Sequence, residues 1–394
     1  MTFLGYERPN GSVGARNHVL VLPPGIIADQ ICHFVRGTKT VMSADSGSGR
    51  TRNDRATIAR TWVGLGCNPN VASVIIHGAS LGGAYPELRA DTLADRIART
   101  GKRVETLHVE GDDTLDAISE GIRRARAMVH EASKLRRRPF SDACLSLGVK
   151  CGASDTTSGI AGNPVIGYVF DKLVQAGGTA FFGETTEIIG AEHLLSKRGV
   201  DDAVAHAIVD AACRVDEKAK ATGQDIRTIN PVPANIAGGL TTLEEKSLGA
   251  IHKSGSMPIQ GVLQYSERPT GRGLYFVDNW MTMTSIFMGY AAAGAQLVLF
   301  QLGGGGLMSD AIFYTSGGVV APLLWTTANQ KTRDRAGWLL DVYSGTVIEG
   351  TETISEVGER LYHTILDVAS GTMTKSETLT RITPNQVYTQ EPMF

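Results

Sequence analysis

The sequence has few cysteines for its length, and their arrangement excludes one common way of stabilising a protein. There are five cysteines among 394 residues, an odd number, and no two of them form a Cys-x-x-Cys pair. A disulfide framework is therefore not expected. The five cysteines are scattered along the chain, at Cys32, Cys67, Cys144, Cys151 and Cys213.

Long apolar runs, a signal peptide and a strong net charge are missing as well. No segment approaches the roughly 20 apolar residues that cross a bilayer, and the first residues lack the basic, apolar and small-residue order of a signal peptide. We therefore expect a cytoplasmic protein. The formal net charge is −2, so neither nucleic acid nor a membrane is expected as a partner. We interpret the one dense basic run, Lys134 to Arg138, as a solvated helix end, with an anion or partner patch as the alternative.

Nucleotide-binding motifs are also missing. No Gly-x-Gly-x-x-Gly opens a helix after the first predicted strand, and no Gly-Lys-Ser/Thr motif occurs, so no nucleotide is expected. One hydrolase-like motif is present, because Gly78 to Gly82 matches Gly-x-Ser-x-Gly after the predicted strand Ser73 to His77. This makes Ser80 a candidate serine nucleophile, although no histidine and aspartate partners can be assigned to it.

The pattern along the chain predicts two packed α/β domains. The chain is about twice the usual length of one domain. Short apolar runs, such as His18 to Leu22, alternate with stretches of helical period. We therefore predict a Rossmann-like, doubly wound parallel sheet in residues 1–138 and a second α/β domain with the main motifs in residues 139–394. The boundary is placed in a linker at Arg136 to Asp142, and the tail from Thr374 has little pattern.

Two polar segments follow predicted strands, which is where open parallel sheets place their ligand crevices. In Cys151 to Gly159, small residues leave backbone N–H groups free to face an anion, and Asp155 is a candidate metal ligand, base-orienting residue or helix cap. A plain turn with a helix cap is the alternative. In Gly183 to His193, the carboxylates of Glu184 and Glu187 can converge on one cation or one substrate proton.

Two further segments are candidates. In Asn230 to Gly249, Thr242 and Glu245 match a capping box, which explains them structurally. Lys246 is not explained in this way, because a lysine in the first turn is opposed by the helix dipole; it is either an anion-binding or basic residue or an ordinary exposed lysine. The glycine run Gly303 to Gly306 either wraps a carboxylate or simply turns the chain.

These segments together resemble the altronate/galactarate dehydratase (UxaA-like) family. The opening residues look like the start of that family's main region, and Pro258 to Leu263 look more like the large (beta) subunit of sulfolactate sulfo-lyase than like the sugar-acid dehydratases. In that subfamily a small separate subunit supplies a domain that other members carry at their N-terminus and that this chain lacks. The segments that carry the resemblance are Gly5 to Asn17, Cys151 to Asp155, Glu184 to His193, Asn230 to Asn235 and Glu244 to Gly249.

The resemblance implies removal of a proton next to a carboxylate, followed by loss of hydroxide or sulfite, commonly with iron. The sequence departs from the family at its cysteines, since the positions after the first three strands are Ile26, Ser48 and Leu81 here, and the helix position after Lys246-Ser-Leu-Gly is Ala250. Because the cysteines at all three strand-end positions are absent, we predict that no iron–sulfur cluster is present. The family's Gly-Arg-Gly-Thr is replaced by the glycine run, which removes a guanidinium.

We therefore predict a carbon–oxygen or carbon–sulfur lyase that removes water or sulfite from a small anionic hydroxy acid. The catalytic candidates are Asp155, Glu184, Glu187 and Lys246, which we expect to line one solvent-reachable pocket at the carboxyl ends of the second-domain strands. The substrate-binding candidates are Arg16, Asn17, Ser154, Ser158, Asn235, Thr241, Thr242, Gly304 and Gly305.

Two explanations of charge stabilisation stay open. Either Lys246, Arg16 and backbone N–H groups near Cys151 stabilise the developing charge, or a divalent cation, Mg²⁺ or Fe(II), is held by Asp155, Glu184 and Glu187. The expected partners are a small subunit and further copies of the chain in a homo-oligomer. The alternative functions are a family member that acts only as a binding or regulatory subunit, and a serine hydrolase that uses Ser80.

Overall fold

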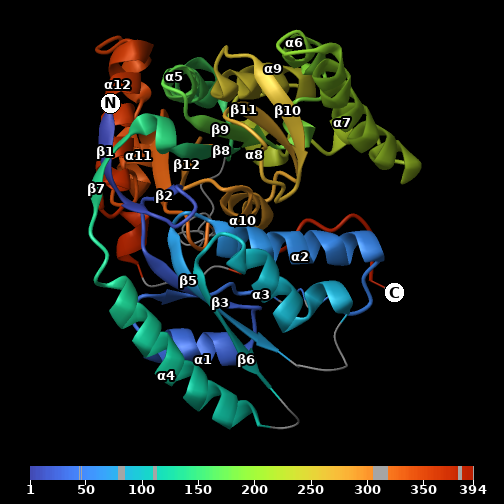
Figure 1. Ribbon diagram of the computed structural model, residues 1–394. Helices are drawn as coiled ribbons and strands as arrows, with labels where there is room; N and C mark the ends of the chain where they lie inside the picture. Colours follow the sequence, from blue (N-terminus) through green and yellow to red (C-terminus); the bar gives the residue numbers. More distant parts are fainter. Residues whose placement is uncertain are drawn as a thin grey trace.

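The computed structural model describes residues 1–43, 45, 47–78, 85–109, 113–304, 318–379 and 384–393. Figure 1 shows two lobes, one above the other, with the N-terminal third of the chain in the lower lobe. Each lobe is built on a parallel sheet. This confirms the predicted α/β class with two domains. Among the described residues no helix is long and apolar enough to cross a membrane.

The N-terminal domain has a four-stranded parallel sheet with helices on both faces. Val19 and Val21 pack under the α1 and α4 helices, whereas Leu20 and Leu22 pack under α2 and α3. Both faces of the strand are therefore buried, which explains its unbroken apolar sequence. The strand order is β4 (Thr38–Lys39), β3 (His18–Leu22), β5 (Val71–Gly78) and β6 (Arg103–His108). The helices are α1 (Ile26–Phe34), α2 (Arg52–Cys67), α3 (Ala90–Ala98) and α4 (Thr114–Ala132).

The C-terminal domain has a seven-stranded parallel sheet. Helices α5 (Asn163–Gln175) and α12 (Ile354–Ala369) pack on one face through a core that includes Phe170 and Leu361. Helix α10 (Met283–Ala293) packs on the other face. The strand order is β10 (Ile259–Gln264), β11 (Gly273–Asp278), β9 (Thr179–Gly183), β8 (Ser146–Gly152), β12 (Leu297–Leu302), β13 (Leu323–Thr327) and β14 (Val342–Tyr343).

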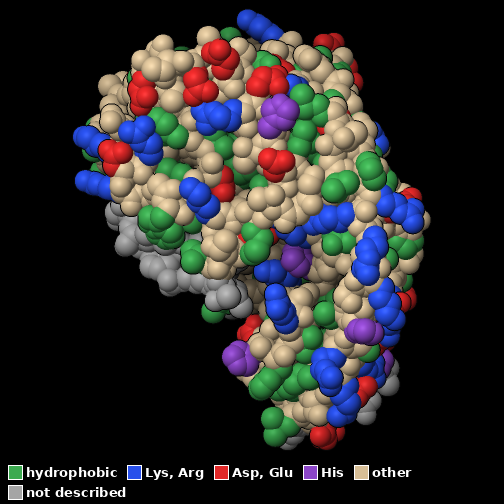
Figure 2. Space-filling view, turned by 90° about the vertical axis from the view of Figure 1, so that its left-hand side faces the viewer, with side chains coloured by type: hydrophobic (Ala, Val, Ile, Leu, Met, Phe, Trp, Pro, Cys, Tyr) green, Lys and Arg blue, Asp and Glu red, His purple; other side chains and the backbone are tan. Residues whose placement is uncertain are grey.

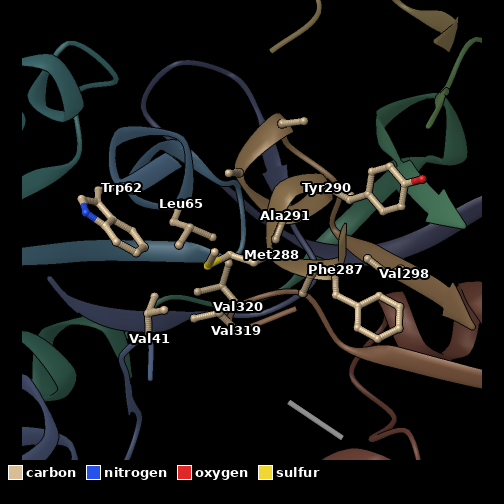
Figure 3. Close-up of a cluster of buried hydrophobic side chains, with 14 of the residues drawn as sticks. Val41, Trp62, Leu65, Phe287, Met288, Tyr290, Ala291, Val298, Val319 and Val320 are labelled. Carbon is tan, nitrogen blue, oxygen red and sulfur yellow. The ribbon is translucent and has the colours of Figure 1, made fainter. Parts of the chain in front are cut away.

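One hydrophobic core joins the two domains. Helix α10 is apolar on all sides because it lies between the larger sheet and helix α2 of the N-terminal domain. Figure 3 shows Met288 of α10 beside Leu65 of α2, and Phe287 of α10 beside Val298 of β12. The two lobes are therefore held together by a continuous apolar contact.

The linker predicted at Arg136 to Asp142 is instead largely a strand. β7 (Arg138–Ser141) pairs antiparallel with β1 (Thr2–Glu7), which also pairs with β2 (Val13–Gly14). The N-terminal ammonium of Met1 lies 2.9 Å from Asp142 Oδ2 and adds an ion pair at the same place. The partner strand is more than 130 residues away in the sequence, so no local pattern predicts this pairing.

Several elements were not predicted. The polar, Gly-rich and Pro-rich sequence of Asn230 to Gly239 predicts a long loop, but this segment contains helix α8 (Pro233–Ala237). The low-pattern tail packs back on the N-terminal domain, where Gln390 N donates to Asp54 Oδ1 at 2.7 Å. The other unpredicted elements are α1, β10, β11, β13, β14 and α11 (Gln330–Ala336). The helical period predicts two helices within Gly190 to Thr222 and one at Leu243 to His252, and these are observed as α6 at Glu192–Ser196, α7 at Asp202–Ala221 and α9 at Leu243–Ile251.

Candidate functional site

The candidate site lies where the strand order of the larger sheet reverses. From β8 the chain continues to β9 on one side, whereas β12 lies on the other side of β8. Ligand crevices of parallel sheets lie at such points, outside the carboxyl ends of the strands. The loops that follow β8 and β12 meet at this point, because Gly303 N donates to Gly152 O at 2.9 Å. The fold therefore brings the predicted motifs after β8, β9 and β12 to one edge.

Asp155 fastens these two loops together. Its carboxylate accepts five hydrogen bonds, and this leaves it little capacity for another ligand. Within its own loop the bond from Ser158 N, at 3.0 Å, fits the turn and helix cap considered from the sequence. Across to the next loop, Gly304 N donates to it at 2.8 Å. The other donors are the Thr157 and Ser158 hydroxyls and the Asn329 side-chain amide.

Glu184 lies at the centre of a buried ion cluster. Its backbone has φ 73° and ψ 70°, a left-handed conformation that is uncommon for a residue with a side chain. This conformation follows directly after β9 and turns the side chain into the interior, where Glu184 is 0% exposed. The carboxylate accepts from Lys150 Nζ at 2.5 Å, from Cys151 N at 3.1 Å and from Lys253 Nζ. It therefore joins the ends of β8 and β9.

Glu187 links this cluster to Lys246. Its carboxylate lies 2.9 Å from Lys253 Nζ and 3.4 Å from Lys246 Nζ. Burial by itself raises the pKa of Glu187, but Lys253, Lys246 and Lys150 outweigh burial and lower the pKa to about 2. Burial lowers the pKa of Lys253, but Glu184 and Glu187 outweigh it and raise the pKa above its usual range. Both partners are therefore charged at neutral pH.

Lys246 is held by two asparagines as well as by Glu187. Its ammonium donates to Asn230 Oδ1 at 2.9 Å and to Asn235 Oδ1 at 3.2 Å. Asn235 is itself fixed, because its amide nitrogen donates to Ser154 O at 2.9 Å. The buried lysine therefore has a defined position rather than the freedom of a surface lysine. The interpretation as an ordinary exposed lysine is wrong, since Lys246 is 5% exposed.

A cavity of about 230 Å³ opens beside this cluster. It lies between the loop and helix that follow β8 and the helix α9, and the ionisable residues on its wall are Asp155, Glu245, Lys246 and His252. Glu184 and Glu187 do not line it. We expected all four catalytic candidates to line one solvent-reachable pocket; the structure places two of them on the wall and buries the two glutamates behind Lys246.

The cluster carries a surplus of one positive charge. Lys150, Lys246 and Lys253 face Glu184 and Glu187, and all five side chains are buried. Buried charges attract each other strongly and are costly to leave unpaired. A surplus positive charge next to a cavity favours an anionic ligand there.

Several predicted substrate-binding residues lie elsewhere. Arg16 pairs with Glu377 at 2.7 Å and donates to backbone carbonyls, so it holds the C-terminal segment. Asn17 accepts from Arg8 at 2.8 Å. Thr241 and Thr242 are bonded to Glu245 and cap helix α9. None of these side chains lines the cavity, and each has a structural partner instead.

Of the other predicted binding residues, some lie at the site and one lies outside the described residues. Ser154 and Ser158 line the cavity, and Gly304 binds Asp155 through its backbone. Gly305 and the alternative nucleophile Ser80 lie outside the described residues.

Sequence reasoning missed Lys150 and Lys253. Lys150 is a lysine inside an otherwise apolar strand that is buried on both faces, and that pattern alone signals a buried partner. Lys253 follows helix α9 and has no comparable signal. Asn230 and Asn279 were also missed; Asn279 Oδ1 accepts from Glu184 N at 3.0 Å and helps to hold its left-handed turn.

The residues present do not fit a metal ion at Asp155, Glu184 and Glu187. Among the described residues, no three histidine, cysteine or acidic side chains converge to hold one. The two glutamates face lysine ammonium groups, and Asp155 is saturated with donors. Burial, followed by Glu187, raises the pKa of Cys151 to about 11, so its thiol stays protonated and is a poor metal ligand.

Comparison with known proteins agrees with this arrangement. Residues 143–389 match the family D-galactarate/altronate dehydratase, C-terminal, and residues 5–133 match D-galactarate dehydratase/altronate hydrolase, second domain. (2R)-sulfolactate sulfo-lyase subunit beta of Chromohalobacter salexigens is 36% identical over 386 residues, 96% of this chain and 95% of that protein. Altronate dehydratase of Bacillus subtilis is 30% identical over 392 residues, 95% of this chain and 75% of that protein.

Galactarate dehydratase (L-threo-forming) of Escherichia coli is 32% identical over 325 residues, 79% of this chain and 59% of that protein. The two matched ranges fall on the two lobes of the structure, and the larger one contains the whole buried ion cluster. The chain therefore belongs to the D-galactarate/altronate dehydratase family.

Proposed function

We propose that the protein is a lyase that removes water or sulfite from a small anionic hydroxy acid, with Lys246 as the group that exchanges the substrate proton. The observation that carries this proposal is that Lys246 is the member of the buried ion cluster that also lines the cavity. The lyase class is supported by the similar proteins, which are named a sulfo-lyase and two dehydratases.

The charge balance of the cluster gives Lys246 this role. Glu184 and Glu187 neutralise two of the three lysines, so loss of a proton from Lys246 leaves the buried cluster neutral. His252 also lines the cavity but is exposed, and it is the second candidate for proton transfer.

In the reaction, the C–H bond next to the substrate carboxylate breaks and its proton passes to neutral Lys246. The electron pair forms the carbon–carbon double bond, and the β-substituent leaves with its own bonding pair as hydroxide or sulfite. A departing hydroxide also takes up one proton to become water. Backbone N–H groups and the surplus charge of the cluster stabilise the anionic intermediate. No step is assigned to a metal ion.

Kinetics of Lys246→Met test the assignment, with His252→Asn as the comparison. The substrates are sulfolactate, altronate and galactarate, and the readout is sulfite or the keto acid product. We expect Lys246→Met to lower kcat by at least about a hundredfold, the lower scale for a lost acid–base group. His252→Asn should keep kcat within about tenfold of wild type. Normal turnover in Lys246→Met together with loss in His252→Asn would transfer the role to the histidine.

We also propose that a small partner subunit covers the mouth of this cavity. Ile160 and Leu248 line the cavity, and with Ile236 nearby on α8 they are exposed apolar side chains. Such exposed patches mark interaction sites. The similarity to a protein named subunit beta supports the idea. Co-expression with a candidate small subunit, followed by size-exclusion chromatography, tests it, and Leu248→Glu should abolish co-elution.

A further inference from the structure

A second cavity lies in the N-terminal domain, apart from the candidate site. Its volume is about 760 Å³, within the range of small-molecule pockets. It is bounded by the start of β5 and β6, by the end of helix α4 and by the turn after β1. It therefore lies at the amino ends of these strands, the edge opposite to the one that parallel sheets usually use. It shares no lining residue with the cavity beside Lys246.

The inner wall of this cavity contains Arg8, a buried arginine that binds neutral acceptors only. Its guanidinium donates to the carbonyl oxygens of Pro69 and Arg16, both at 2.7 Å, and to Asn17 Oδ1 at 2.8 Å. A guanidinium has five N–H donors, so two of them are left over. Burial above all lowers the pKa of Arg8 to about 10, which reflects the lack of a nearby carboxylate.

Lys102, also on this wall, is bound in the same way. Its ammonium donates to Gly66 O at 3.1 Å and to Asn68 O at 2.5 Å, the carbonyls at the end of helix α2. These two bonds leave one of its three donors. Burial first, and then Arg8, hold the pKa of Lys102 well below its usual range. Neither side chain has an anionic partner among the described residues, and a bound anion would favour the charged form of both.

Ser73 on the same wall gives an independent indication of a missing ligand. It is 5% exposed, and its hydroxyl has no hydrogen-bond partner among the described residues. Buried polar groups without a partner are uncommon and usually have a functional or solvent explanation. The wall therefore presents unused donors of three different kinds.

The rim of the cavity is strongly basic. Six cationic and two acidic side chains line the cavity as a whole, counting the inner wall. Both acidic side chains already pair with arginines, Glu131 with Arg103 and Glu7 with Arg138. Lys134 and Arg136, at the rim, have no carboxylate partner in the described part of the chain. Figure 2 faces the side of the molecule on which β1 and β7 lie and shows lysine and arginine side chains along the lower lobe. Lys134 and Arg136 of the basic run are therefore free to face an anion in this cavity.

We propose that this cavity is a binding site for a small multivalent anion, either a phosphate-bearing or a polycarboxylate metabolite. The unused donors of Arg8, Lys102 and Ser73 bind one charged group of the ligand, and Lys134 and Arg136 bind the outer group. The site does not depend on the proposed lyase activity, because it lies at the other domain's sheet and contains none of the residues assigned to catalysis.

Isothermal titration of the full-length protein with inorganic pyrophosphate, and separately with citrate, tests the proposal at constant ionic strength. We expect one site per chain for at least one of these probes. The double variant Lys134→Gln/Arg136→Gln should weaken that binding by at least about tenfold, the scale of one lost charge-assisted hydrogen bond. The matched control is Arg123→Gln/Arg126→Gln, with the same charge change on the exposed face of helix α4, which ends just before Lys134. It should bind like the wild type.

Ser73→Ala gives a second measurement that does not depend on the rim. Its hydroxyl makes no bond in the free protein, so the melting temperature should stay unchanged while binding becomes at least about threefold weaker. The proposal is overturned if neither probe binds, or if both double variants lose affinity equally, since general electrostatic attraction then explains the binding. Tighter binding of a hexaglutamate peptide than of either probe would also overturn it in favour of an acidic polypeptide partner.

Discussion

Replacement of Glu184 by glutamine should destabilise the fold strongly, although the two side chains have nearly the same shape. Glu184 is completely buried and is the shared partner of Lys150 and Lys253. The amide removes the negative charge and leaves Glu187 as the one carboxylate in contact with this group of lysines. The expectation that Glu184 lines a solvent-reachable pocket is wrong, because the side chain is completely buried.

The expected loss of stability follows from the cost of removing one charge of a buried ion pair while the other charge stays. That cost is about 3–5 kcal/mol, because the remaining charge stays buried. In addition, the glutamine NH₂ group either meets an ammonium or faces Cys151 N, both of which are donors. We therefore expect Glu184→Gln to lower the free energy of unfolding by at least about 3 kcal/mol, measured by urea denaturation.

Two further variants make the result decisive. Glu359→Gln removes a half-exposed partner of Lys172 and should cost less than about 1 kcal/mol. The double variant Glu184→Gln/Lys150→Met restores the charge balance and should recover part of the lost stability. A loss below about 1 kcal/mol in Glu184→Gln, equal to that of Glu359→Gln, would refute the buried-cluster reasoning.

Two other predictions concern the same region. Because the pKa of Glu187 is lowered from 4.5 to about 2, its contribution to stability is present above about pH 4.5 and is lost as the pH falls toward 2. The free energy of unfolding from urea denaturation should drop by about 3 kcal/mol more over that range in the wild type than in Glu187→Gln, and parallel pH profiles would contradict this. Asp155→Ala should cost at least about 2 kcal/mol, because it leaves Ser158 N and Gly304 N without acceptors. The exposed helix cap Asp201→Ala is the control, at about 1 kcal/mol, and an equal cost in both variants would show that Asp155 is only a cap.

Much of the fold could be predicted from local pattern. The strand predicted at His18 to Leu22 and the amphipathic helix predicted at Ile354 to Ala369 have the bounds of β3 and α12, because both have a strong apolar pattern and clear ends. The pairing of β7 with β1 could not be predicted, since it depends on two segments at opposite ends of the first domain. Helix α1 was missed because it follows Gly25 without a capping side chain.

The candidate site was predicted in part. The motifs at Asp155, Glu184 and Lys246 were found because each contains polar residues next to a strand or helix start, and the fold brings them to one edge of the sheet. The depth of each residue was not predictable, since it depends on the left-handed turn at Glu184 and on Lys150 and Lys253, which come from other segments. The spacing of the motifs in the sequence predicts that they lie at one edge of the sheet, but it does not predict which of their side chains are buried.

The composition of the cluster is itself an argument for function. A buried group of five charges contributes little to stability, because burying each ion costs several kcal/mol and well-packed apolar residues of similar volume are often at least as stable. The left-handed conformation of Glu184 adds backbone strain. A fold that only needed a core at this position would be served better by leucine and methionine. Fixed, fully bonded charges beside a cavity are what a reaction that moves a proton next to a carboxylate requires.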